Sequence, residues 1–244
     1  MKILVIDTST MVSSVALVDE EKIYSEITIN AKKNNHSEKL ILLIDEVLKS
    51  SDVKLEDVDV FGCSVGPGSF TGLRIAISTI KGLAQSLQKP VIGASTLQSL
   101  AYNMPFAQGI LCPVMDAQRD EVYTCFYQWR QGELSALTEE SVLSVKQLLE
   151  YIDKQEETVI LLGDALKKFT PEVLEAYQGK IQIAPMMSRM PKASSLGSLA
   201  IDMSKKGHLI TYSDLNPNYM RKSQAEAQLD EKRLEAAQKI AARR

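Results

Sequence analysis

The strongest constraint on the fold is a strand, a glycine-rich turn and a helix that follow one another without a break. The apolar run VDVFGCSV (58–65) leads into the turn GPGSFTG, FTGLRIAISTIKGLAQSL reads as a helix, and KPVIGAST reads as the next strand. Three glycines and a proline fall within the seven residues of that turn. Such a turn at a helix N-terminus presents free amides, so it can bind a phosphate or simply reverse the chain tightly.

Three strands and a helix precede this unit. KILVID, SSVALV and KIYSEITI follow one another at short turns and have the apolar patterns of strands. Asn35 is the expected N-cap of the next helix, with Glu38 at capping-box spacing. The order βββαβαβ predicts a mixed sheet with helices packed on it. The apolar positions of the first helix recur at helical intervals and are Leu40, Leu43, Ile44, Val47 and Leu48.

The second half of the chain repeats the beginning of the first. ILCPVMD is another apolar run that ends in Asp, EVYTCFYQW alternates as a strand does, and TVILLGDA precedes a helix expected near Pro171. Either the two halves are a duplication or strands that end in Asp recur by chance. The duplication predicts an N-terminal lobe of residues 1–105, completed by a helix at about 193–207. A smaller lobe of residues 106–192 and a partly helical extension of 208–244 would follow.

Composition excludes several functional classes. The net charge of -3 and the 24% of charged residues are those of an ordinary globular protein, so a partner would have to supply most of the positive charge for any nucleic acid. We find no apolar run long enough for a membrane span and no signal-peptide pattern, and expect a cytoplasmic protein. Cys63, Cys112 and Cys125 lie in strand-like runs and are expected in the core, while His36 and His208 have no spacing typical of a zinc site.

Five motifs together resemble one known family. They are ILVIDTST, HSEKLILLIDEVL, SVGPGSFTGLRIAISTIKGLA, PVIGASTLQSLA and MDAQRDEVY, of which GPGSFTGLR is the most specific. The chain resembles the TsaB (YeaZ) family, of the actin/sugar-kinase/Hsp70 (ASKHA) ATPase superfamily. The resemblance implies an α/β fold in which two duplicated βββαβα lobes face one another.

The resemblance also implies a role in tRNA modification. Proteins of this family are subunits of the bacterial machinery that transfers threonylcarbamoyl from threonylcarbamoyl-AMP to tRNA. The acceptor is N6 of the adenosine next to the anticodon, in tRNAs that read codons beginning with A. The implied partners are a catalytic TsaD-like subunit and a TsaE-like ATPase, with tRNA contacted only through the complex.

TsaD-like proteins carry a helical His-x-x-x-His motif, in which two imidazoles one turn apart bind a metal ion. Thr96 and Leu100 stand at the matching positions of this chain, in GASTLQSLAYN. We therefore expect no metal site, no catalytic residues and no metallopeptidase activity, and interpret the chain as the non-catalytic subunit.

Nucleotide binding remains the alternative function, as a stand-alone ATPase or kinase. In the superfamily the first strand ends in an Asp and a phosphate-binding hairpin, which corresponds here to Asp7, Thr8, Ser9 and Thr10. That hairpin is usually glycine-rich, but DTSTMVSS and the second-half counterpart MDAQRDE contain no glycine. We expect polar turns without a bound cofactor.

A non-catalytic subunit needs a surface for its partner. The helix that follows Asn35 and the helix Thr71–Leu87 are expected to dock on the TsaD-like subunit, or on a second copy of this chain in isolation, so the two dimers would compete. The alternative is that both apolar stripes are core. The predicted interface residues are Leu40, Leu43, Ile44, Val47, Leu73, Ile77, Ile80 and Leu83.

Several polar residues have two interpretations each. His36 is expected to cap its helix or contact a partner, and Arg74 to reach a phosphate or partner carboxylate or to brace the loop through backbone carbonyls. The group Asp116, Arg119, Asp120 and Glu121 forms either an acid/base cluster or, as we expect, a turn held by local ion pairs. The charged stretch SQAEAQLDEKRLEAAQKIAARR is expected to be a solvated helix, or else a tRNA or partner contact.

Overall fold

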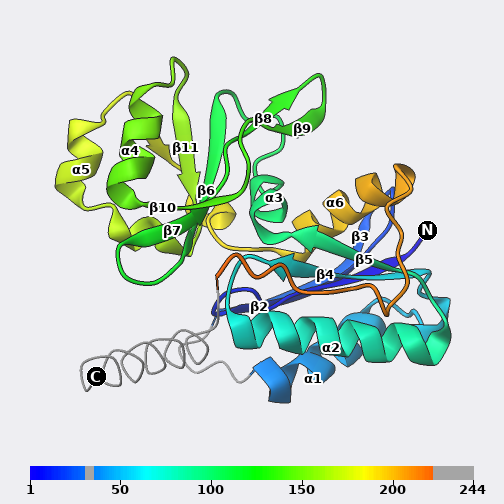
Figure 1. The fold of residues 1–244 in the computed structure, drawn as a ribbon. Helices are drawn as coiled ribbons and strands as arrows, with labels where there is room; N and C mark the ends of the chain where they lie inside the picture. The colour runs from blue at the N-terminus through cyan, green and yellow to red at the C-terminus, as the bar shows by residue number, and fades with distance from the viewer. Residues whose placement is uncertain (31–35, 222–244) are drawn as a thin grey trace, which may run out of the picture.

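The chain folds into two lobes, each built on its own β-sheet (Figure 1). The computed structural model describes residues 1–30 and 36–221. The first sheet has five strands in the order β3-β2-β1-β4-β5, and the second has seven, with β10-β7-β6-β11-β12 as its main path. The predicted cap Asn35, the side chain of His36 and the charged C-terminal stretch lie outside the described residues.

The first lobe has the predicted mixed sheet. Its central strand β1 pairs antiparallel with β2 and parallel with β4, which in turn pairs parallel with β5. Helices α1 and α2 cover one face, and α6, from the far end of the chain, covers the other (Figure 1). The elements are β1 (Ile3–Asp7), β2 (Val12–Val18), β3 (Ile23–Asn30), α1 (His36–Ser50), β4 (Val60–Gly66), α2 (Phe70–Leu87), β5 (Val91–Ser95), α3 (Thr96–Ala101) and α6 (Ala193–Lys205).

Alternation along β1 divides the core of this lobe into two layers. Leu4 and Ile6 pack in the cluster formed with α1 and α2, whereas Ile3 and Val5 pack in the cluster formed with α6. Successive side chains of a strand point to opposite faces, so a strand covered by helices on both sides must be apolar throughout. This explains why the run that begins the sequence is continuous and not alternating.

The apolar stripes of α1 and α2 face the first sheet. Seven of the eight predicted interface side chains are 0–8% exposed, and Leu83 is partly buried against the same cluster. This corrects the expectation that they lie on a partner-facing surface, because their helical spacing reflects packing on the strands. A partner that touches α1 would meet Ile41 and Leu42, which are 56% and 66% exposed. The seven buried residues are Leu40, Leu43, Ile44, Val47, Leu73, Ile77 and Ile80.

The second lobe repeats the topology of the first. Its central strand β6 pairs antiparallel with β7 and parallel with β11, as β1 pairs with β2 and β4. In the sequence, the hairpin β8–β9 comes between β7 and β10, and it has no counterpart in the first lobe. This shared strand order supports the duplication. The elements are β6 (Ile110–Asp116), β7 (Glu121–Thr124), β8 (Tyr127–Arg130), β9 (Glu133–Ala136), β10 (Ser141–Ser144), α4 (Val145–Asp153), β11 (Val159–Leu162), the 3₁₀ helix η2 (Asp164–Lys168), α5 (Pro171–Ala176) and β12 (Ile181–Ile183).

The end of the described chain returns to the first lobe. The Ala193 amide at the start of α6 donates to Ser14 Oγ at 2.9 Å, which anchors the helix on β2. Residues 208–221, which we call the C-terminal strap, then run in a mostly extended path along this lobe (Figure 1). Ile210 forms a β-bridge with Val91, and Leu215 is buried in the cluster with α1 and α2.

All three cysteines lie in the core, which confirms the prediction from the sequence. Cys63, Cys112 and Cys125 are buried and form no disulfide. Burial raises the pKa of the Cys112 thiol to about 12, although a hydrogen bond with Thr124 opposes the shift. These thiols are therefore protonated at neutral pH and unsuited to nucleophilic or metal-binding chemistry.

Candidate functional site

The candidate functional site lies where β1 and β4 end and the glycine-rich turn begins. Asp7 is the last residue of β1 and is fully buried. Its carboxylate accepts hydrogen bonds from the Ser9 amide at 2.9 Å, the Ser9 hydroxyl at 2.6 Å and the Ser64 hydroxyl at 2.5 Å. The carboxylate therefore braces the turn after β1 against β4.

The glycine-rich turn packs directly on this first turn. The Ser69 amide donates to the Ser9 carbonyl at 2.7 Å, and the Thr8 hydroxyl donates to the Gly72 carbonyl at 2.8 Å. A Cβ atom at Gly72 would lie 1.9 Å from the Thr8 carbonyl oxygen. Glycine is thus required here because two backbone segments meet, and the close approach that a phosphate would need is taken by the chain itself.

The N-terminus of α2 is capped from within the same turn. The Ser69 hydroxyl accepts from the Gly72 amide at 3.2 Å, and the Leu73 amide donates to the Ser69 carbonyl at 2.9 Å. An anion at a helix N-terminus is bound by such amides when they are free. Here the Ser69 and Gly72 amides have partners in the protein, and the Leu73 amide makes the first bond of the helix itself.

The C-terminal strap covers the other side of the turn. The Asn218 amide donates to the Val65 carbonyl at 2.7 Å, and the ring of Tyr219 stacks on that of Phe70 with centroids 4.2 Å apart. Arg74 donates from Nε to the Tyr219 hydroxyl at 2.9 Å and lies 4.1 Å from the centroid of the Phe70 ring. Arg74 thus braces the loop, but through an aromatic side chain of the strap and not through the predicted backbone carbonyls.

The equivalent turn of the second lobe is also closed by side chains. Asp116, at the end of β6, forms ion pairs with Lys167 at 2.9 Å and Lys168 at 2.8 Å. Burial opposes ionisation of Asp116, but hydrogen bonds from both lysines outweigh it and lower its pKa to about 2. The neighbouring Asp164 accepts from the Asp116 amide at 2.9 Å, and burial raises the pKa of its own carboxyl group. Asp116 is therefore a structural anion.

The ion pairs of this turn are not local, which corrects the sequence interpretation. Lys167 and Lys168 come from η2, and Glu121 pairs with Arg221 of the strap. Arg221 also donates from Nη1 to the Ala117 carbonyl at 2.7 Å. The strap therefore joins the glycine-rich turn of the first lobe to the polar turn of the second.

The positions that correspond to the TsaD-like histidines lie in a buried helix. Thr96 and Leu100 of α3 are both 0% exposed, and the Thr96 hydroxyl has no hydrogen-bond partner. Ser95 caps this helix by accepting from the Gln98 amide at 3.2 Å and also contacts Glu140 of the second lobe. Over residues 1–30 and 36–221, no group of three or more His, Cys, Asp or Glu side chains is placed to hold a metal ion.

Sequence reasoning missed the strap and the two lysines. Tyr219 and Arg221 lie in a polar stretch without periodicity, and Lys167 and Lys168 lie far from Asp116 in the sequence. The only local signal was an aromatic residue close to Pro217 within an otherwise polar segment.

None of the described helices is both long and apolar enough to cross a bilayer.

Two lobes with the same strand order, each with a polar turn after its central strand, define a protein of the actin-like ATPase fold. The activator of 2-hydroxyisocaproyl-CoA dehydratase from Clostridium difficile, solved with bound ADPNP, shares this fold. Its TM-score is 0.50 at 8% identity, over 90% of this chain and 100% of that one. At that identity the likeness concerns the fold alone.

The family follows from closer relatives. A family model described as "TsaD: tRNA N6-adenosine threonylcarbamoyltransferase" matches residues 22–228. The chain is 30% identical over 227 residues to the tRNA threonylcarbamoyladenosine biosynthesis protein TsaB of Bacillus subtilis, covering 93% of this chain and 97% of that protein. It aligns with the solved structure of YeaZ from Pseudomonas aeruginosa with a TM-score of 0.73 and 29% identity, over 90% of this chain and 100% of that one. The chain belongs to the TsaB (YeaZ) family.

Proposed function

We propose that this protein is a non-catalytic subunit that activates a TsaD-like transferase during threonylcarbamoylation of tRNA. The observation that carries the proposal is the closed glycine-rich turn, in which the Thr8 carbonyl oxygen occupies the space next to Gly72. A phosphate-binding turn would need that space and the neighbouring amides. The buried Thr96 and Leu100 support the same conclusion, because neither is a metal ligand.

The outer face of α1 is the proposed contact with the transferase subunit. Ile41 and Leu42 are large apolar side chains with more than half of their surface exposed. They are flanked by Asp45, Glu46 and Lys49, which are exposed and polar. Apolar anchors surrounded by polar groups are typical of protein interfaces. A second copy of the chain would use the same face, so self-association and binding of the transferase subunit should compete.

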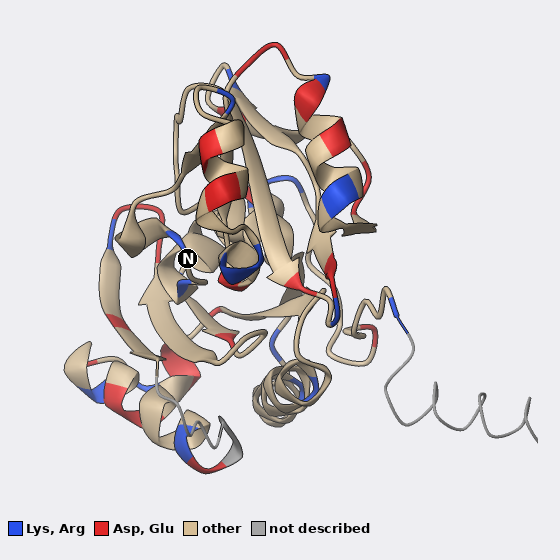
Figure 2. Cartoon of the chain, turned by 90° about the vertical axis from the view of Figure 1, so that its left-hand side faces the viewer, with Lys and Arg blue, Asp and Glu red and all other residues tan. Residues whose placement is uncertain are grey.

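The proposal assigns tRNA binding to the complex. Figure 2 shows Lys and Arg interspersed with Asp and Glu along the described chain. The net charge of the whole chain is -3. Because Lys and Arg contacts to phosphates supply most of the affinity for nucleic acids, the transferase subunit should provide them. A TsaE-like ATPase is the third proposed component.

Substitution of Ile41 by Glu tests the interface. We expect Ile41→Glu to weaken the complex with a TsaD-like subunit by at least about thirtyfold, since loss of a central apolar anchor costs about 2 kcal/mol or more. The matched control is Ile23→Glu, because Ile23 lies on β3 and is also 56% exposed. Equal affinities of the two variants for the TsaD-like subunit, measured by titration calorimetry, would refute the assignment of the outer face of α1 as the interface. Leu43→Glu is expected to unfold the protein, because Leu43 is only 8% exposed.

Reconstitution tests the function itself. The transferase subunit, the ATPase and tRNA are combined with threonylcarbamoyl-AMP, with and without this protein, and modified adenosine is measured by mass spectrometry. We expect modification to require this protein and to be lost with Ile41→Glu but not with Ile23→Glu. Modification at the full rate in its absence would overturn the proposal.

A further inference from the structure

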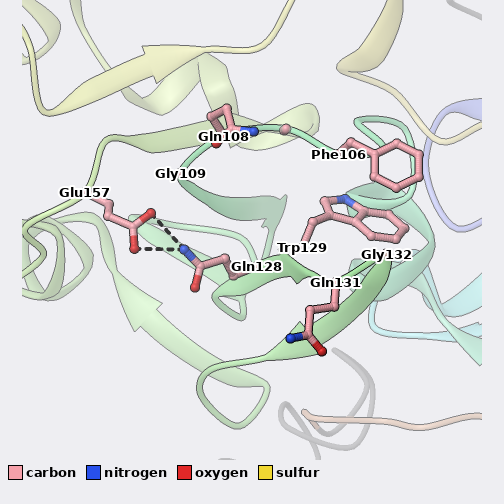
Figure 3. A pocket seen from close by; sticks show the side chains of 9 residues that line it. Phe106, Gln108, Gly109, Gln128, Trp129, Gln131, Gly132 and Glu157 are labelled. Atoms are coloured by element: carbon pink, nitrogen blue, oxygen red, sulfur yellow. Dashed lines mark hydrogen bonds between the residues drawn. The ribbon is translucent and has the colours of Figure 1, made fainter.

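Two surface features lie outside the turns described above. One is a pocket lined by Phe106, Trp129 and Glu157 (Figure 3). Both oxygens of Glu157 already accept from Gln128 Nε2, at 2.8 Å and 2.7 Å, so this carboxylate is engaged within the protein. The other feature is the outer face of α1, where large apolar side chains remain exposed.

The outer face of α1 is apolar at its centre and acidic around it. Ile41 and Leu42 are 56% and 66% exposed. Three acidic and one basic side chain are exposed on the same helix, namely Glu38, Asp45, Glu46 and Lys49. Lys49 pairs with Asp45 at 2.6 Å, whereas the two glutamates form no ion pair within the described residues. The face therefore carries a net negative charge beside its apolar centre.

The C-terminal residues 222–244, which lie outside the described residues, have the complementary pattern in their sequence. At the helical period of about 100° per residue, an apolar stripe and five basic residues fall within one arc of about 120°. The stripe is Ala225, Leu229, Ala236 and Ile240, and the basic residues are Lys222, Lys232, Arg233, Lys239 and Arg243. The four acidic residues of the segment fall outside this arc. The sequence thus predicts a helix with one apolar and basic face.

The described chain ends where this segment can reach α1. Strands β3 and β4 both run parallel to β1, so α1 and α2, which follow them, begin at the same end of the sheet. Tyr219 of the strap stacks on Phe70, the first residue of α2, and α1 packs beside α2 (Figure 1). As a helix, residues 222–244 would span roughly 34 Å, against roughly 22 Å for α1, so the segment is long enough to lie along it.

The two faces match in both apolar surface and charge, as the two sides of a specific interface do. We propose that residues 222–244 dock along the outer face of α1 and cover Ile41 and Leu42. Because the segment belongs to the same chain, its effective concentration at α1 is on the order of millimolar, and a weak contact suffices. The segment then competes with the transferase subunit for this face. That competition rests on the function proposed above, whereas the docking does not.

Paramagnetic NMR of the full-length protein tests the docking. Gln238→Cys places a reactive thiol on the opposite side of the predicted helix, and the three native cysteines are buried, so a nitroxide can be attached selectively. We expect the nitroxide to broaden the δ1 methyl signal of Ile41 but not that of Ile152 in the second lobe. An unbroadened Ile41 signal would overturn the proposal.

Two matched variants test whether the apolar stripe makes the contact. Leu229→Glu places a charge within the stripe and should restore the Ile41 signal. Leu234→Glu makes the same change on the opposite side of the predicted helix and should leave the signal broadened. Equal signals in the two variants would overturn the proposal. So would broadening in a mixture in which the nitroxide and the methyl label are on different chains, because it would assign the segment to a second copy.

RNA is the other ligand that a basic face attracts. We expect stoichiometric tRNA to leave the Ile41 signal broadened. Recovery of the signal when tRNA is added would assign the basic face to RNA and overturn the proposal.

Affinity for a TsaD-like subunit tests the competition. A face that is covered for nine-tenths of the time binds its partner about tenfold more weakly, so Leu229→Glu should raise the affinity about threefold to tenfold, with Leu234→Glu as the control. If Leu229→Glu abolishes the docking but the two variants bind the subunit equally, the competition is overturned, and with it the transferase contact on α1. Absence of Ile41 broadening would instead overturn the docking alone.

Discussion

Substitution of Gly72 by Ala tests whether the glycine-rich turn is a packing element. The added Cβ would lie 1.9 Å from the Thr8 carbonyl oxygen, against about 3.5 Å for an ordinary contact, so the two segments must separate by roughly 1.5 Å. Such overpacking costs about 1–3 kcal/mol. The hydrogen bonds from Thr8 to Gly72 and from Ser69 to Ser9 would be weakened as well, at about 1 kcal/mol each.

Gly82→Ala provides the matched control in the same helix. Nothing lies within 4 Å of a Cβ added at Gly82, so this change should stabilise the protein by about 0.5–1 kcal/mol through helix propensity. We expect Gly72→Ala to lower the free energy of unfolding by about 2–4 kcal/mol, after allowing for the same propensity gain. The assay is urea unfolding of dilute protein without any nucleotide. Equal stabilities of the two variants would refute the packing role.

Two further predictions concern the turn of the second lobe and the strap. Although burial opposes it, hydrogen bonds from Lys168 and Lys167 lower the pKa of Asp116 from 3.8 to about 2. Because solvent screens these partly exposed groups, the ion pairs should contribute about 1 kcal/mol to stability above pH 4, and this contribution is lost as the pH falls towards 2. Asp116→Asn should abolish this part of the pH dependence of unfolding. An unchanged pH profile in Asp116→Asn would contradict the assignment. Tyr219→Ala removes the stack on Phe70 and the bond from Arg74, so proteolysis of the strap should accelerate about tenfold, with Tyr219→Phe in between. Equal cleavage of all three proteins would show that the strap is held elsewhere.

The fold class and most elements of the first lobe could be read from the sequence because their signals are local. In the second lobe the sequence missed α4, and the stretch EVYTCFYQW, predicted as one strand, forms the two strands β7 and β8. The continuous apolar run Ile3–Ile6 indicated a strand, and the change from the glycine-rich turn to helical spacing indicated the start of α2 at Phe70. The shared pattern of apolar strands ending at Asp7 and Asp116 pointed to two related lobes, which the strand order supports. These features depend on side-chain periodicity and turn chemistry, which a linear sequence retains.

The candidate site depended on contacts between distant segments, which the sequence does not encode locally. The run from Leu40 to Ile44 is apolar at every position, and only the place of the sheet decides that Ile41 and Leu42 face outwards. Likewise, GPGSFTG is compatible with a phosphate or with a neighbouring backbone, and the approach of Thr8 to Gly72 selects the second. The sequence thus determined most strands and helices of the first lobe, the fold class and the family. The tertiary structure decided which polar groups are already paired and which apolar side chains remain exposed.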